Sequence, residues 1–193
     1  LSYHLAAREE GLSFMRRNID AWWPFIDAGA EAIVSTASAC GVMISDYGDV
    51  LQDDPEYAAK ARRVSELAKD LSEVIEAEDL DVLRESTGNQ ATAVHCPCTL
   101  MHGQKRDGSV ERILERAGIP LVETREKHLC CGSAGTYSIL QKALSQRLLK
   151  NKVEALESGD PDIIASANIC CLLHIQTGTQ LEVRHWIELL DQA

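Results

Sequence analysis

Six of the seven cysteines occur in three close pairs, and this clustering is the strongest chemical signal in the sequence. The pairs are Cys96/Cys98, Cys130/Cys131 and Cys170/Cys171, and the seventh cysteine is Cys40. Adjacent thiols cannot both pack on one face of a strand or helix, and a disulfide between neighbours would be strained. Thiolates that converge on a metal explain the pattern better. Soft thiolate ligands favour zinc or an iron–sulfur cluster.

Composition and charge restrict the class of protein. The 193 residues are 45% hydrophobic and 25% charged, which is typical of soluble globular domains. Thirty acidic residues against 19 basic residues give a net charge of −11, which argues against nucleic acid as a partner. No apolar run approaches the roughly 20 residues of a transmembrane segment, and no signal peptide opens the chain. Clustered cysteines without a sign of export predict a reducing, cytoplasmic environment.

Strands and helices alternate along the chain, and these elements must position the cysteines. The predicted strands are 32–36, 91–95, 119–124, 163–166 and 183–186. The predicted helices are 3–23 (ending before Pro24), 55–77, 110–117 and 137–157, and a helical remnant with a loop is predicted at 81–90. The alternation predicts an α/β fold of mostly parallel sheets with crossover helices.

An internal repeat divides the sequence. Residues 29–40 align without gaps on residues 159–170, and an amphipathic helix precedes each segment. In the second copy this helix follows Cys130-Cys131-Gly132, whereas the first copy begins where its own cysteine pair would end. We therefore expect two pseudo-repeated halves in a fragment of a longer protein. Residues 1–88 form the truncated first repeat and residues 89–193 the complete second repeat.

The paired cysteines follow the carboxyl ends of predicted strands. Cys98, the Cys130/Cys131 pair and the Cys170/Cys171 pair each stand just after such an end. Loops from neighbouring parallel strands meet at one edge of a sheet, so these loops can bring four or five thiolates together. The sequence therefore predicts a metal site at this edge.

Four segments of the sequence carry a family resemblance. They are His95–Gln104, His128–Tyr137, Ala167–His174 and Val183–Leu189. These segments resemble the C-terminal cysteine-rich "CCG" domain of the glycolate oxidase iron–sulfur subunit family, which is related to iron–sulfur oxidoreductases of the heterodisulfide reductase type. The resemblance covers nearly the whole chain.

The resemblance implies a ligand set. Its direct matches are Cys98, Cys130, Cys131 and Cys171, which would bind an iron–sulfur cluster of the 4Fe–4S type, with zinc as the alternative. Further candidate ligands are His174, Cys96, Cys170 and Cys40. His174 stands where the related reductases have a last cysteine, and Cys40 would be the last ligand of the truncated first site. Cys96 and Cys170 replace the usual aspartate and glycine, and free cysteines there also suit an apolar core. The gap-free repeat pairs Cys40 with Cys170, while the family motif favours Cys171.

The resemblance also implies a function. The chain would belong to an electron-transfer subunit of a glycolate (2-hydroxy acid) oxidase or dehydrogenase, passing electrons from flavin-containing subunits to a downstream acceptor. No nucleotide-binding Gly-x-Gly-x-x-Gly motif or catalytic triad is visible, so no catalytic residue is assigned and the fragment is not expected to be active alone. The expected location is the cytoplasm, with peripheral association at the inner face of the cytoplasmic membrane through the complex. The alternatives are a redox-silent, zinc-stabilised docking domain and a thiol oxidoreductase that cycles Cys130/Cys131.

Other polar residues are expected to have structural roles. The histidines at positions 95, 102 and 128 are expected to support the metal ligands or to order loops rather than to bind metal themselves. A basic stretch in the helix predicted at 137–157 is expected to form a solvated face, with docking of an acidic partner subunit as the alternative. Its members are Lys142, Arg147, Lys150 and Lys152.

Overall fold

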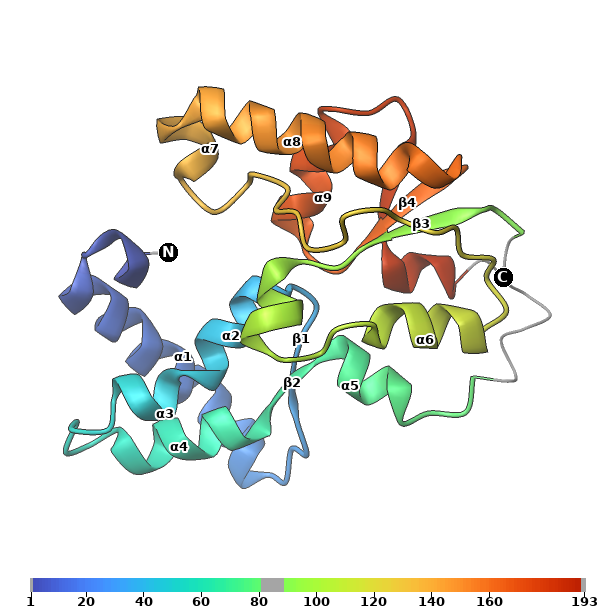
Figure 1. Ribbon diagram of the computed structural model, residues 1–193. Helices are drawn as coiled ribbons and strands as arrows, with labels where there is room; N and C mark the ends of the chain where they lie inside the picture. The colour runs from blue at the N-terminus through green and yellow to red at the C-terminus, as the bar shows by residue number, and fades with distance from the viewer. Residues whose placement is uncertain (1, 81–88, 192–193) are drawn as a thin grey trace. The chain divides into compact units, whose positions relative to one another are not determined.

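The chain folds into two compact units. The computed structural model describes residues 2–80 and 89–191 (Figure 1). Unit 1 consists of Leu1–Ser35 and Cys40–Asp70, and unit 2 of Thr36–Ala39 and Leu71–Ala193. The helix that follows residue 70 belongs to unit 2 because it packs against another helix of that unit. The repeat boundary between residues 88 and 89 stays a prediction. The predicted loop at 81–90 lies almost entirely outside the described residues.

Unit 1 is a helical layer with a two-stranded parallel sheet. Its elements are η1 (Tyr3–Leu5), α1 (Arg8–Asp27), β1 (Ile33–Ser35), α2 (Ser38–Ser45, whose first two residues belong to unit 2), α3 (Tyr47–Val50), α4 (Ala58–Leu67) and β2 (Ala68–Asp70). The core is formed by apolar side chains of α1, α3 and α4, among them Ile19 and Val64, which are fully buried. The strand predicted at 32–36 is confirmed as β1.

Two predicted helices of this half differ from the structure. Helix α1 does not end before Pro24 but continues to Asp27. A proline in the last turn removes one backbone hydrogen bond, and the Ala28 N–H still bonds to the Pro24 carbonyl at 3.2 Å. The helix predicted at 55–77 is divided into α4, β2 and α5 (Leu71–Glu76). Residues 68–70 leave the helix because they pair in parallel with β1.

Unit 2 is built on a three-stranded parallel sheet. Its elements are α5, β3 (Thr92–His95), η3 (Thr99–Gly103, a π-helical turn), α6 (Ser109–Arg116), α7 (Tyr137–Leu140), α8 (Lys142–Leu156), η4 (Glu157–Gly159), β4 (Ile163–Ser166), α9 (Ile169–Gln176), β5 (Glu182–His185) and η5 (Trp186–Leu189). The strand order is β3-β4-β5, and both pairings are parallel. The parallel sheets and the alternating helices confirm the predicted α/β fold.

The strand predicted at 119–124 is reduced to a single bridge. Leu121 pairs in parallel with Thr92 at the outer side of β3. The Thr92 N–H donates to the Pro120 carbonyl at 2.9 Å, and the Val122 N–H donates to the Thr92 carbonyl at 3.0 Å. Pro120 has no N–H of its own, which restricts it to the edge of a sheet. The helix predicted at 137–157 is also interrupted, because Gln141 separates α7 from α8 with φ −121° and ψ 48°.

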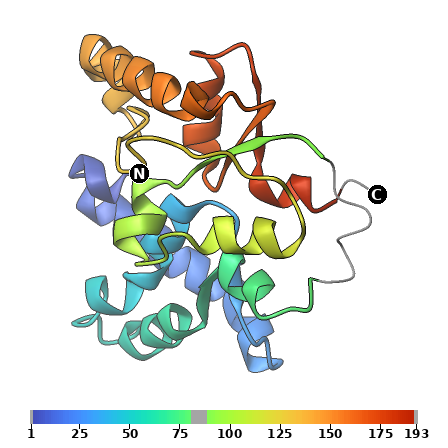
Figure 2. The same cartoon turned by 45° about the vertical axis from the view of Figure 1, so that its right-hand side comes forward.

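Helices cover both faces of the unit 2 sheet, as expected for parallel strands. Figures 1 and 2 show α8 and α9 on one face and α6 with η5 on the other. Side chains alternate along the strands, so Ile163 and Ala165 of β4 pack with α6 while Ile164 packs with α8 and α9. On β3 the same alternation sends Val94 towards α6 and Ala93 towards α8.

The aligned segments of the internal repeat adopt the same local structure. Residues 29–40 contain β1 and the start of α2, and residues 159–170 contain β4 and the start of α9. In both copies a parallel strand is followed after a short turn by a helix that carries a cysteine in its first turn. This correspondence supports the alignment, and the two-repeat division stays a prediction.

Candidate metal centre

Four thiols from three loops meet at the carboxyl edge of the unit 2 sheet. Cys98 follows β3, the Cys130/Cys131 pair follows the bridged segment at Leu121, and Cys171 lies in the first turn of α9 after β4. The thiols interact in a series, Cys98 with Cys130, Cys130 with Cys131, and Cys131 with Cys171. The structure therefore brings together the four cysteines of the predicted ligand set.

The topology of the sheet explains this meeting point. The segment at Leu121 lies on one side of β3 and β4 lies on the other. Helix α6 leads to the segment at Leu121, and helix α8 leads to β4. The two helices lie on opposite faces of the sheet (Figure 2). Loops that leave a sheet in opposite directions open a crevice at the carboxyl ends of the strands, which is where open α/β sheets bind ligands.

Hydrogen-bond donors surround the sulfur atoms. The Gly132 N–H donates to Cys130 Sγ at 3.3 Å, and Asn168 Nδ2 donates to Cys171 Sγ at 3.3 Å. The backbone N–H of Thr99 bonds to Cys98, and the N–H of Ser133 bonds to Cys131. Such donors favour the thiolate form, which is the form that binds metal.

The four thiols influence one another, and their pKa values are shifted in opposite directions. Hydrogen bonds from the thiols of Cys131 and Cys98 hold the pKa of Cys130 far below its usual value. Interaction with Cys131, and then with the Asn168 amide, lowers the pKa of Cys171. Donation to the Cys130 thiolate raises the pKa of both Cys98 and Cys131, and burial raises them further. A thiophilic cation would displace the protons of the thiols that it binds.

His95 joins this group, although the sequence predicted that it supports the ligands or orders a loop and does not itself bind metal. Potential ligand atoms of His95, Cys131 and Cys171 all lie within 4.8 Å of one another, and all three residues are buried. Strand alternation places His95 on the same side as Ala93, facing α8, and its Nδ1 is 2.9 Å from Ser166 Oγ. Burial, helped by the charge of Lys152, lowers the pKa of His95 to about 3. The imidazole is therefore neutral, as a metal ligand must be.

Gly132 fixes the loop that carries Cys130 and Cys131, the cysteine loop, against α8. Its φ is +87°, and an added Cβ would lie 2.5 Å from the Ser145 carbonyl oxygen. Ser145 Oγ donates back to the Gly132 carbonyl at 2.8 Å. His174 Nε2 is 3.1 Å from the same Oγ, and donates to it because the hydroxyl proton is already used. This bond fixes Nε2 of His174, and metal ligation by His174 stays a prediction.

Comparison with known proteins identifies this part of the chain. Residues 92–176 match the model of a cysteine-rich domain named CCG, a range that includes His95 and all four thiols of the site. This part of the chain belongs to the family of cysteine-rich CCG domains. The match lies within the predicted second repeat.

Similarity to individual proteins extends over more of the chain. The glycolate oxidase iron–sulfur subunit of Escherichia coli (strain K12) is 51% identical over 193 residues, which is 100% of this chain and 47% of that protein. Lactate utilization protein A of Geobacillus kaustophilus is 28% identical over 173 residues, which is 85% of this chain and 71% of that protein. The probable glycolate oxidase iron–sulfur subunit of Bacillus subtilis is 27% identical over 183 residues, which is 93% of this chain and 40% of that protein. The chain thus spans about half or less of the two glycolate oxidase subunits it matches.

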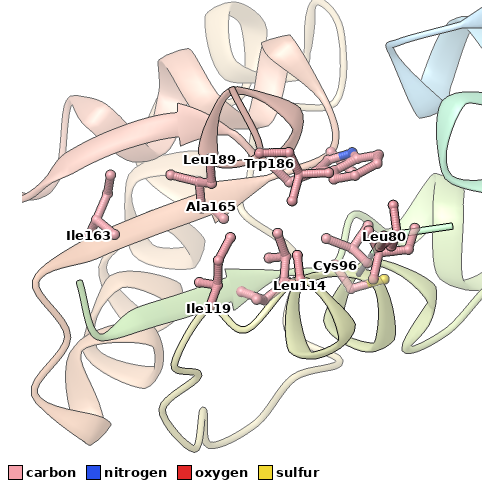
Figure 3. Packing of buried hydrophobic residues seen from close by; sticks show 14 of the residues in the cluster. Leu80, Cys96, Leu114, Ile119, Ile163, Ala165, Trp186 and Leu189 are labelled. Carbon is pink, nitrogen blue, oxygen red and sulfur yellow. The ribbon is translucent and has the colours of Figure 1, made fainter. Parts of the chain in front are cut away.

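The remaining cysteines lie apart from the four thiols. In the CCG domain, Cys96 points to the opposite face of the sheet and packs among apolar side chains such as Leu100 and Leu114 (Figure 3 labels Leu114). Burial, together with Glu111, raises the pKa of Cys96 to about 12. Cys170 is exposed on α9, beside the buried Cys171, and Cys40 is exposed in unit 1. The geometry thus brings Cys171 rather than Cys170 to the site.

One lysine of the CCG domain is buried, contrary to the sequence-based expectation. Lys142, Arg147 and Lys150 are exposed on α8, as predicted for a solvated face. Lys152 is 0% exposed, and its Nζ donates to the Lys127 carbonyl at 3.0 Å. The prediction was wrong for Lys152 because the basic residues do not share one helical face. Lys152 lies next to Val153, on the side of α8 that packs on the sheet.

Proposed function

We propose that the four thiols of the CCG domain bind an iron–sulfur cluster and that the chain transfers electrons in a glycolate (2-hydroxy acid) oxidase complex. The observation that carries the proposal is the meeting of Cys98, Cys130, Cys131 and Cys171 at one sheet edge. The 51% identity to the E. coli glycolate oxidase iron–sulfur subunit supports the assignment to this class of oxidoreductase.

The donor set suits a cluster. Four cysteine thiolates are the usual ligands of a 4Fe–4S cluster, which when bound would accept and release single electrons. The N–H groups of Gly132, Ser133 and Thr99 and the Asn168 amide would stabilise negative charge on the sulfur atoms. Burial of Cys131 and Cys171 to 3% and 7% exposure keeps water away from half of the site. The more exposed Cys98 side would be the side open to an electron donor or acceptor.

The oxidation of the 2-hydroxy acid would take place elsewhere in the complex. Flavin-containing subunits would remove the hydride, and this chain would pass the electrons to a downstream acceptor. No residue of the chain is proposed to be catalytic. Among the described helices, none has both the length and the hydropathy needed to cross a membrane. We place the complex in the cytoplasm, with peripheral attachment to the inner face of the cytoplasmic membrane.

Zinc is the second candidate, and one observation favours it. His95, Cys131 and Cys171 form a compact group of mixed nitrogen and sulfur donors, and tetrahedral sites of this composition are common for structural zinc. In that case the domain would be redox-silent and would serve for docking.

Metal analysis of anaerobically prepared protein distinguishes the two candidates. Iron, acid-labile sulfide and zinc are quantified per chain before and after reconstitution, and the visible spectrum is recorded. We expect about four iron and four sulfide per chain, with broad absorption that is bleached by a reductant. A colourless protein that retains one zinc per chain would exclude the cluster in favour of the zinc domain.

A pair of neighbouring variants tests the ligand assignment. Cys171→Ser removes the buried thiol, while Cys170→Ser makes the same chemical change one residue earlier at an exposed position. We expect Cys171→Ser to lose most of the bound metal and Cys170→Ser to retain it at the wild-type ratio. Equal loss in both variants would contradict the ligand set.

A further inference from the structure

Lys152 is a buried cation without an acidic partner. Lysine is almost never fully buried unless it is paired, yet Lys152 is 0% exposed. Within the described residues, no carboxylate forms an ion pair with it, and its Nζ donates to the Lys127 carbonyl at 3.0 Å. A carbonyl oxygen accepts one of the three ammonium protons in a hydrogen bond but does not neutralise the positive charge. A buried charge of this kind is costly unless an opposite charge lies nearby.

The opposite charge comes from the thiol site. Burial lowers the pKa of Lys152, and the nearby cysteines 131, 130 and 171 of the site act in the opposite direction, as does Cys96 on the other face of the sheet. The cysteines of the site would carry negative charge as thiolates when they bind a metal. Helix α8 contacts both α9 and β3, so it holds Lys152 close to the carboxyl edge of the sheet.

We propose that Lys152 is the buried counter-charge of the thiolate site, a positioning residue that stabilises the metal-bound, anionic state. The proposal rests on the proposed function only in requiring that these thiolates bind a metal. A fixed positive charge offsets the repulsion between converging thiolates and the cost of removing them from water. With a redox-active group in the site, the same charge favours the reduced, more negative state and raises the reduction potential.

The Lys127 carbonyl is part of this arrangement. Lys127 lies on the loop that leads to Cys130, three residues before the first thiol of the pair. The hydrogen bond from Lys152 thus ties the cysteine loop to α8, as the Ser145–Gly132 bond does further along the loop. A structural role could rest on this bond alone, so the test must separate the bond from the charge.

Three substitutions at position 152 and one control achieve this separation. Lys152→Met removes both charge and bond, Lys152→Gln removes the charge and keeps a donor, and Lys152→Arg keeps the charge. The control is Lys150→Met, which removes one positive charge from the exposed side of the same helix. Zinc affinity of the full chain is measured by competition with a chromophoric chelator, and the reduction potential is measured on reconstituted protein.

We expect Lys152→Met and Lys152→Gln to bind zinc about 10- to 100-fold more weakly than wild type, and their reduction potentials to shift to more negative values. Lys152→Arg and Lys150→Met should stay close to wild type. Wild-type affinity in Lys152→Gln, or a loss in Lys152→Met alone, would overturn the proposal and leave Lys152 a structural residue. If wild type binds no metal at all, the proposed function fails instead. Unfolding of the metal-free variants by urea shows whether a loss reflects misfolding, and the Gln variant serves if the Met variant does not fold.

Discussion

At the scale of single residues, Gly132 shows how much the thiol site depends on close backbone approach. Its φ of +87° is unfavourable for any residue with a Cβ, and the space that a Cβ would need is filled by the Ser145 carbonyl and by Leu148. We expect Gly132→Ala to lower the free energy of unfolding by about 2–5 kcal/mol, from about 1–2 kcal/mol of backbone strain and about 1–3 kcal/mol of overpacking. Urea unfolding of the metal-free protein measures this value.

Gly29→Ala is the matched control for this prediction. Gly29 has a φ of +96°, and no atom lies within 4 Å of an added Cβ. The substitution should therefore cost only the backbone strain of about 1–2 kcal/mol. If both alanine substitutions lowered the free energy of unfolding by the same amount, the contact between the cysteine loop and α8 would not be tight.

The residues of the site differ in how far the sequence reveals them. The four thiols could be predicted because adjacent cysteines rarely have a packing role and because each loop follows a strand. His95 could not be separated from an ordinary strand residue, since its role depends on alternation relative to Ala93 and on the partner strand that carries Ser166. Lys152 was misassigned because burial of a lysine by a helix depends on which face packs on the sheet.

At the scale of elements, the start of α4 depends on Asp54. Asp54 Oδ1 accepts the N–H groups of Glu56 and Tyr57 at 3.0 Å, and Oδ2 accepts Arg16 Nε at 2.8 Å. The Tyr57 N–H bond, followed by Arg16, lowers the pKa of Asp54 from its ordinary value of 3.8. The carboxylate thus satisfies N–H groups ahead of the helix and links α4 to α1.

This lowered pKa predicts a pH dependence of stability. The unfolded chain binds the Asp54 proton more tightly than the folded chain, so the contribution is present above pH 3.8 and is lost as the pH falls through the folded pKa. We expect Asp54→Asn to be less stable than wild type near neutral pH, with a difference that shrinks as the pH falls below 3.8 and through the lowered pKa of Asp54. Urea unfolding across this range measures the effect.

The neighbouring residue provides the control for Asp54. Asp53→Asn makes the same change in net charge at an exposed position. It should leave the pH dependence of stability as in wild type. A constant difference between Asp54→Asn and wild type from neutral to acid pH would show that the hydrogen bonds, and not the carboxylate charge, matter at this position.

Elements with a strong local pattern were predictable, and elements that depend on distant pairing were not. Strands β3 and β4 are short and wholly buried, and α6 has its apolar residues on one face before Gly118, whose φ is +86°. Strand β2 was missed because its residues, Ala68–Asp70, continue a helical pattern until β1 pairs with them. The predicted strand at 119–124 failed for the opposite reason, since it finds a partner only at Leu121.

At the scale of the whole molecule, the two units have separate cores. The buried cluster of unit 1, around Ile19 and Val64, shares no residue with the two clusters that cover the unit 2 sheet, within the described residues. The four thiols, His95 and Lys152 all belong to unit 2. A ligand that binds only the folded site therefore stabilises the unit that contains it.

Metal removal should consequently act on one unit. At a free metal concentration of 1,000 times the dissociation constant, binding adds about 4 kcal/mol to the stability of the folded site. We expect chelation to speed amide hydrogen exchange in α8 and α9, which carry Lys152, Ser145 and Cys171, while α1 and α4 keep their exchange rates. Exchange followed by mass spectrometry, with and without chelator, resolves these helices as separate peptides. An equal increase in α1 would mean that the two units open together, so that the thiol site stabilises the chain as a single cooperative body rather than one unit of it.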